Sequence, residues 1–263
     1  AEAPALAKVP TYRTKGEGYH TWLERKPIKL TIYATVAILI GGIVQIIPTL
    51  LIESNIPTIS SVKPYTPLEL EGRDIYIREG CVGCHSQMIR PFRSEVERYG
   101  EYSKAGEYVY DHPFLWGSKR TGPDLHRIGQ KYNDSWHLNH MYDPQSTSPG
   151  SIMPAYKWLV RNELDKSDTE AKMEAMVTLG VPYTEAEIAN AQNQMIEQGT
   201  IIEQNLYADP DFAKNYEADK KYAKENGEAF VEMKNREIVA LIAYIQRLGT
   251  DIKVKDEQKI SKK

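Results

Sequence analysis

An uncharged stretch from Leu30 to Ile52 constrains the fold of this chain more than any other feature. It contains 23 residues, is rich in Ile, Leu, Val and Ala, and has Gln45 as its most polar side chain. As a helix rising 1.5 Å per residue it would be about 35 Å long, enough to cross a hydrocarbon layer of about 30 Å. The alternative, a buried core helix, is usually shorter. We therefore expect residues 30–52 to form a single transmembrane helix, which Pro48 can kink near its end.

The charges before this stretch predict its orientation. Residues 1–29 carry six basic and three acidic side chains, and Arg25, Lys26 and Lys29 lie beside the span. The positive-inside rule places residues 1–29 in the cytoplasm and everything after Ile52 on the outer face, which is the periplasm for a bacterial inner membrane. A cleaved signal peptide would be shorter and nearer the terminus, so we expect a retained, single-pass anchor.

Two further helices are predicted beyond the span. Residues 53–66 are rich in proline and indicate an extended tether. The sequence Thr66-Pro67-Leu68-Glu69 is a capping box with proline at the first helical position, which predicts a helix from Pro67 to Glu79.

The second helix is predicted from Arg236 to Leu248. Its apolar residues share one helical face, and Gly249 follows as a stop signal. Little period-two alternation occurs in the rest of the chain, so we expect a mainly α protein with long loops.

The segment Cys81-Val82-Gly83-Cys84-His85 contains both cysteines of the chain. Its C-x-x-C-H spacing is typical of covalent attachment of one c-type haem, with thioethers from Cys81 and Cys84 and with His85 as an iron ligand. Two alternatives are a redox-active dithiol and a zinc site completed by His137 and His140. The adjacent histidine favours the haem, and no βαβ pattern of the kind that carries a dithiol is visible.

A haem that only transfers electrons needs a second axial ligand. Met153 is our prediction, because Pro149, Gly150 and Pro154 indicate an extended loop that can present its sulfur to iron. Met141 and His140 remain alternatives, whereas Met88 is too close to His85 in sequence to reach across the ring. A thioether ligand raises the reduction potential relative to a second imidazole.

Thr121-Gly122-Pro123-Asp124-Leu125 resembles the Gly-Pro-x-Leu loop of class I cytochromes c. The resemblance implies a cytochrome c-like domain over residues 67–250, in which the Pro123 carbonyl accepts a hydrogen bond from the ligand histidine. It also implies that the helix before the motif packs on the C-terminal helix, with Gly72 permitting close contact. Three cationic side chains are candidate partners for the haem propionates: Arg90, Arg93 and Arg120.

Residues 161–235 match no part of that fold and are expected to be an acidic helical insertion, followed by a charged tail over 251–263. The insertion has 16 acidic and eight basic residues. Thr184-Glu185-Ala186-Glu187 predicts a capped helix within it. An acidic face can steer a basic donor protein toward this surface, although such a run is more often a solvated face.

Taken together, residues 79–93, 116–125 and 151–154, in this order after a single span, resemble the monohaem cytochrome c subunit of cbb3-type cytochrome c oxidases. The resemblance covers roughly residues 20–160 and the last helix. It implies a permanent polytopic partner subunit with haem b and copper, which reduces oxygen to water. It also implies a calcium ion at the subunit boundary, for which Ser118 is the candidate contact.

In that setting the chain would pass electrons from a dihaem subunit or soluble cytochrome c to the low-spin haem b. The alternative is a membrane-anchored cytochrome that shuttles freely between respiratory complexes. A formal charge of −3 shows no basic excess that would suggest nucleic-acid binding.

Overall fold

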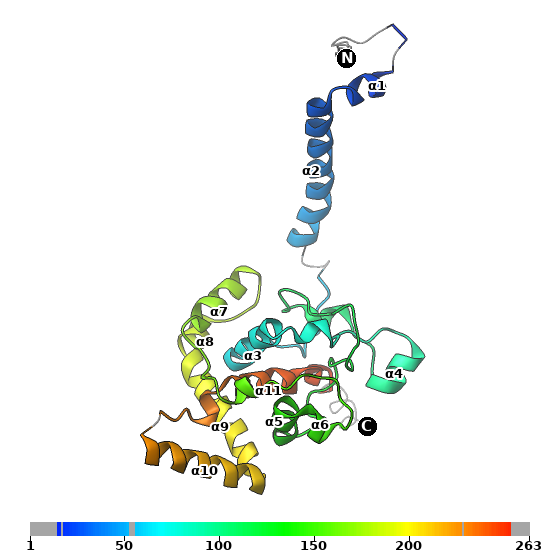
Figure 1. Cartoon of the computed structure of the whole chain (residues 1–263). Helices are drawn as coiled ribbons and strands as arrows, with labels where there is room; N and C mark the ends of the chain where they lie inside the picture. Colours follow the sequence, from blue (N-terminus) through cyan, green and yellow to red (C-terminus); the bar gives the residue numbers. More distant parts are fainter. Residues whose placement is uncertain (1–14, 17, 53–55, 228, 254–263) are drawn as a thin grey trace, which may run out of the picture. The chain divides into compact units, whose positions relative to one another are not determined.

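The computed structural model describes residues 15–16, 18–52, 56–227 and 229–253. Parts of the predicted N-terminal segment, tether and C-terminal tail lie outside this range. The chain divides into two compact units, with the boundary between Pro57 and Thr58. No β-strand occurs among the described residues, so the mainly α prediction is confirmed (Figure 1).

The α-helices are α1 (Tyr19–Glu24), α2 (Pro27–Leu51), α3 (Pro67–Arg78), α4 (Arg93–Tyr99), α5 (Asp134–Tyr142), α6 (Pro144–Thr147), α7 (Thr169–Thr178), α8 (Glu185–Ala189), α9 (Ala191–Tyr207), α10 (Pro210–Asn226) and α11 (Glu237–Arg247). Short 3₁₀ turns cover Cys81–Gly83, Ala105–Tyr108, Lys157–Val160 and Met233–Asn235.

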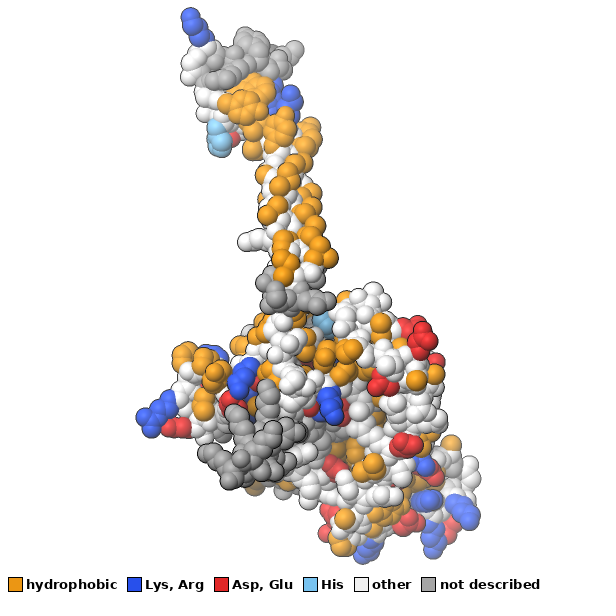
Figure 2. Space-filling model, turned by 180° about the vertical axis from the view of Figure 1, so that it is seen from behind, with side chains coloured by type: hydrophobic (Ala, Val, Ile, Leu, Met, Phe, Trp, Pro, Cys, Tyr) orange, Lys and Arg blue, Asp and Glu red, His pale blue; other side chains and the backbone are white. Residues whose placement is uncertain are grey.

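The first unit contains α1 and α2. Helix α2 begins three residues before the predicted start, because Pro27 occupies its first turn, where a missing N–H costs no hydrogen bond. Its apolar side chains face outward along the whole helix (Figure 2), and Ile38 is 74% exposed. By length and composition, Pro27–Thr49 could cross a membrane.

The second unit is built around α3 and α11, which lie side by side at its centre (Figure 1). The predicted capping box is present: Thr66 Oγ1 accepts from Glu69 N at 3.2 Å, and Glu69 Oε2 accepts from Thr66 N at 2.9 Å. A Cβ added at Gly72 would lie 1.9 Å from the Ala240 carbonyl oxygen. The expectation that Gly72 permits close approach of the two helices is therefore confirmed.

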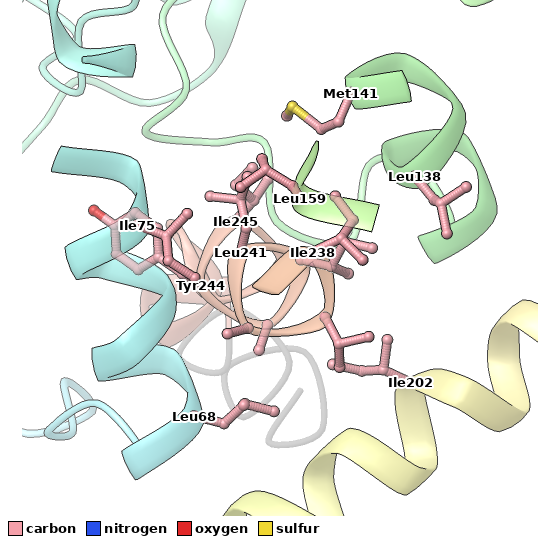
Figure 3. Close-up of a cluster of buried hydrophobic side chains, with 14 of the residues drawn as sticks. Leu68, Ile75, Leu138, Met141, Leu159, Ile202, Ile238, Leu241, Tyr244 and Ile245 are labelled. Carbon is pink, nitrogen blue, oxygen red and sulfur yellow. The ribbon is translucent and has the colours of Figure 1, made fainter. Parts of the chain in front are cut away.

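The main hydrophobic core surrounds α11 (Figure 3). Leu68 and Ile75 approach from α3, Leu138 and Met141 from α5, and Ile202 from α9. The buried face of α11 includes the apolar residues that predicted this helix.

The acidic insertion is an integral part of this unit. Its helix α9 packs against α3, α5 and α11, and Met195, Ile202 and Leu206 belong to the main core. The predicted cap at Thr184 is confirmed at the start of α8. The apolar face of α9 thus explains why residues with a strongly acidic average composition are held inside a compact domain.

Candidate haem site

The cysteine motif lies on a 3₁₀ turn that is separate from α3. Gly80, with a φ of 72°, ends the helix before Cys81, in agreement with the predicted end at Glu79, and the two thiols share the short turn that follows. The Cys81 carbonyl oxygen accepts from Cys84 N at 3.1 Å and from His85 N at 2.9 Å. Cys81 is buried and Cys84 is exposed, and no disulfide joins them.

The loop of residues 121–125 lies against this turn. Gly122 N donates to the Cys84 carbonyl oxygen at 3.0 Å, and Leu125 N donates to the Ser86 carbonyl oxygen at 2.8 Å. His85 Nδ1 lies 2.8 Å from the Pro123 carbonyl oxygen. Because a carbonyl can only accept, Nδ1 carries the proton and Nε2 is the unprotonated nitrogen of the neutral ring.

Gly122 forms a backbone wall for the imidazole. A Cβ at this position would lie 2.2 Å from Cε1 and 2.7 Å from Nδ1 of His85. The ring is therefore held by one hydrogen bond and by direct contact with the loop backbone. The sequence did not predict this contact between Gly122 and His85. The Gly-Pro pair was the only signal that could have indicated it.

Met153 lies in segment 151–156, which has no regular secondary structure. Its half-buried side chain packs on the same hydrophobic cluster that contains Cys81 and Met141. Tyr156 N donates to the Met141 carbonyl oxygen at 2.7 Å and so attaches this loop to α5.

The two histidines of α5 have different environments. His140 Nδ1 lies 2.6 Å from Thr147 Oγ1, and burial followed by the nearby His85 lowers the pKa of His140. His137 is buried without a hydrogen bond to Nε2, and burial lowers the pKa of its imidazole to about 4. No group of three or more His, Cys, Asp or Glu residues suited to a metal ion occurs in the described ranges, so the zinc alternative is not assembled.

Burial also shifts the pKa values of Cys81 and His85. It raises the pKa of the Cys81 thiol to about 12, so this thiol is neutral at pH 7. It lowers the pKa of His85, against the opposing effect of the bond to Pro123. The unprotonated Nε2 of a neutral imidazole can bind iron, and two thiols on the turn just before it are the groups that form thioethers with a haem, so the residues present fit this group.

The three arginines suggested for propionate binding are paired within the chain. Arg90 and Arg120 both bind Glu95, with Arg120 Nη2 at 2.7 Å from Oε2. Arg93 Nε lies 2.7 Å from Glu97 Oε1 on the surface of α4. Ser118 is exposed. The propionate and calcium assignments remain predictions.

One comparison with known proteins identifies a family. A family model described as "Cytochrome C oxidase, mono-heme subunit/FixO" matches residues 20–252, which is most of the chain. The search of curated proteins found no match to the chain.

Proposed function

This chain belongs to the FixO family of mono-haem cytochrome c oxidase subunits, and from that premise we propose that it holds one covalently attached c-type haem. Cys81 and Cys84 would form the thioethers, and His85 and Met153 would be the axial ligands of the iron. Met141 and His140 are the alternatives to Met153, and they lie on α5, to which the Met153 loop is attached.

The observation that carries this proposal is the arrangement around His85. Its Nδ1 atom is committed to the Pro123 carbonyl at 2.8 Å, which leaves Nε2 for iron and fixes the ring orientation. The two thiols lie on the turn that immediately precedes this imidazole. A dithiol enzyme would have no need for a histidine oriented in this way, and a zinc site would need further ligands, which the described residues do not bring together.

The haem, when bound, supplies reversible one-electron chemistry, which would connect a donor cytochrome c or dihaem subunit to the low-spin haem b of a cbb3-type catalytic subunit. The chain itself contributes binding, orientation and exclusion of water. No side chain is required as a nucleophile or general base. The chain is thus proposed as an obligate electron-entry subunit of the oxidase.

We further propose that α2 anchors the chain in the bacterial inner membrane, with the N-terminus in the cytoplasm and residues 67–250 as a periplasmic haem domain. The basic residues before α2 support this orientation. We also propose a calcium ion at the boundary with the catalytic subunit, contacted by Ser118; the described residues of this chain contain no acidic cluster for it, so its other ligands would come from the partner.

The experiment is to extract the full-length chain from membranes with mild detergent and to identify what accompanies it. We expect a c-haem that remains on the denatured polypeptide, together with haem b and copper from the partner subunit. A c-haem without haem b or copper would instead support a freely shuttling anchored cytochrome. A colourless chain whose mass equals its amino-acid sum would refute both.

Two variants test the proposed roles of Cys84 and His85. Cys84→Ala should leave a single thioether, and His85→Gln should abolish the low-spin spectrum. His20→Gln is the matched control, because His20 lies exposed on α1, outside the haem domain. If His85→Gln behaves like His20→Gln, His85 is not an iron ligand.

A further inference from the structure

Asp124 is a buried carboxylate that haem attachment does not require. Its side chain is fully inaccessible, and it accepts three hydrogen bonds from the surrounding chain. Oδ2 accepts from Ser86 Oγ at 2.6 Å and from Met88 N at 2.9 Å, and Oδ1 accepts from His126 N at 2.9 Å. Two of the three donors, Ser86 and Met88, lie 38 and 36 residues before Asp124 in the sequence.

These bonds join the two segments that determine the position of the imidazole. Ser86 follows His85 directly, and Asp124 follows Pro123, whose carbonyl accepts the His85 Nδ1–H. A second link therefore lies beside the histidine bond and joins the residue after the donor to the residue after the acceptor. Sequence reasoning did not identify Asp124, because a lone aspartate in a loop has many ordinary roles.

Arg120 completes the link. Its Nε atom donates to Ser86 Oγ at 2.7 Å, and its Nη2 atom lies 3.6 Å from Asp124 Oδ2 and 2.7 Å from Glu95 Oε2. The guanidinium thus compensates the charge of the buried carboxylate and orients the Ser86 hydroxyl toward it. Arg120 is thus paired with Glu95 and Asp124 within this chain.

We propose that Asp124 is a positioning residue for the iron-binding histidine: together with Ser86 and Arg120 it holds the Pro123 carbonyl on His85 Nδ1 and so sets the potential and ligand geometry of the haem. This inference rests on the proposed function, since it concerns a haem bound at His85. It assigns a role to residues that touch neither thiol nor imidazole.

The direction of the effect follows from two causes. Loosening the loop weakens the hydrogen bond to Nδ1, which makes the imidazole a poorer electron donor and favours ferrous iron. Removing a buried negative charge near the iron also favours the ferrous state. Both raise the midpoint potential of the haem in Asp124→Asn. In Asp124→Asn the side-chain NH₂ replaces one carboxylate oxygen and faces groups that themselves donate. At least one of the three hydrogen bonds to Asp124 is therefore lost.

The test measures the c-haem in the intact, purified complex by redox titration of its α-band and by the EPR g values of the ferric haem. Ser86→Ala removes the 2.6 Å bond without changing charge. Glu71→Gln is the matched control, because Glu71 is also a buried carboxylate that accepts from a hydroxyl at 2.6 Å and pairs with a cation, but toward α7.

We expect Asp124→Asn to raise the potential and change the g values, Ser86→Ala to do the same by a smaller amount, and Glu71→Gln to do neither. If Asp124→Asn does not accumulate, Ser86→Ala alone decides. The proposal is overturned if neither variant differs from Glu71→Gln. It is also overturned if only the potential of Asp124→Asn changes, with Ser86→Ala silent, since this would indicate charge without positioning. Absence of haem from the wild-type chain would instead refute the proposed function.

Discussion

Gly72→Ala tests the contact on which the haem domain is built. Gly72 lies inside α3, so alanine improves helix propensity by about 1 kcal/mol in the absence of other effects. Its Cβ, however, would lie 1.9 Å from the Ala240 carbonyl oxygen, 2.5 Å from the carbonyl carbon and 2.9 Å from Tyr244 Cβ. Two of these atoms belong to the backbone of α11, so no side-chain rotation can relieve the overlap.

The two effects have opposite signs, and their magnitudes decide the outcome. Overpacking a close-packed interior costs about 1–3 kcal/mol, and an overlap with helical backbone belongs at the upper end of that range. Subtracting the propensity gain leaves a net loss of about 2 kcal/mol. For a domain of this size the loss corresponds to a decrease in Tm of about 4–8 °C.

The assay is thermal unfolding of the purified full-length chain, followed by circular dichroism of its helices. Gly42→Ala is the control, because Gly42 also lies inside a helix but has no atom within 4 Å of the added Cβ. We expect Gly42→Ala to leave the unfolding of the second unit unchanged. A Gly72→Ala chain as stable as the wild type would refute the inferred packing of α3 on α11.

Two further predictions concern the site, and a third concerns the pH dependence of stability. Gly122→Ala should displace His85, because the new Cβ would lie 2.2 Å from its ring, and should reduce the yield of low-spin haem. Met153→Ala should open the sixth position, so that the reduced haem binds carbon monoxide, whereas Met141→Ala should not. Burial, followed by a neighbouring arginine, lowers the pKa of His126 well below 6.5. The folded chain therefore keeps this ring neutral while the unfolded chain protonates it, and the free energy of unfolding should fall by about 1.4 kcal/mol per pH unit below 6.5.

Each of these has a control and a contrary result. Gly83→Ala is matched to Gly122→Ala, since Gly83 lies in the neighbouring cysteine turn and has no atom within 4 Å of the added Cβ, and equal haem yields would contradict the wall at Gly122. Carbon monoxide binding by Met141→Ala alone would reverse the ligand assignment. The pH slope, measured by denaturant titration, should be shallower in His126→Gln but unchanged in His20→Gln.

The sequence alone determined the elements that local rules describe. The uncharged span, the capping boxes at Thr66 and Thr184, and the apolar face of α11 are written in consecutive residues, because helical periodicity and capping act within one or two turns. The cysteine motif likewise predicts its chemistry from a spacing of five residues. These features sufficed to indicate a mainly α chain with a candidate anchor and a haem site.

Tertiary structure decided what depends on residues far apart in the chain. Three features arise only after long loops close: the wall that Gly122 forms on His85, the link from Asp124 to Ser86, and the incorporation of α9 into the core. Such contacts depend on which surfaces meet once the helices pack, and no local periodicity records that choice. The same physics explains why the acidic insertion was visible as helices but not as part of the core.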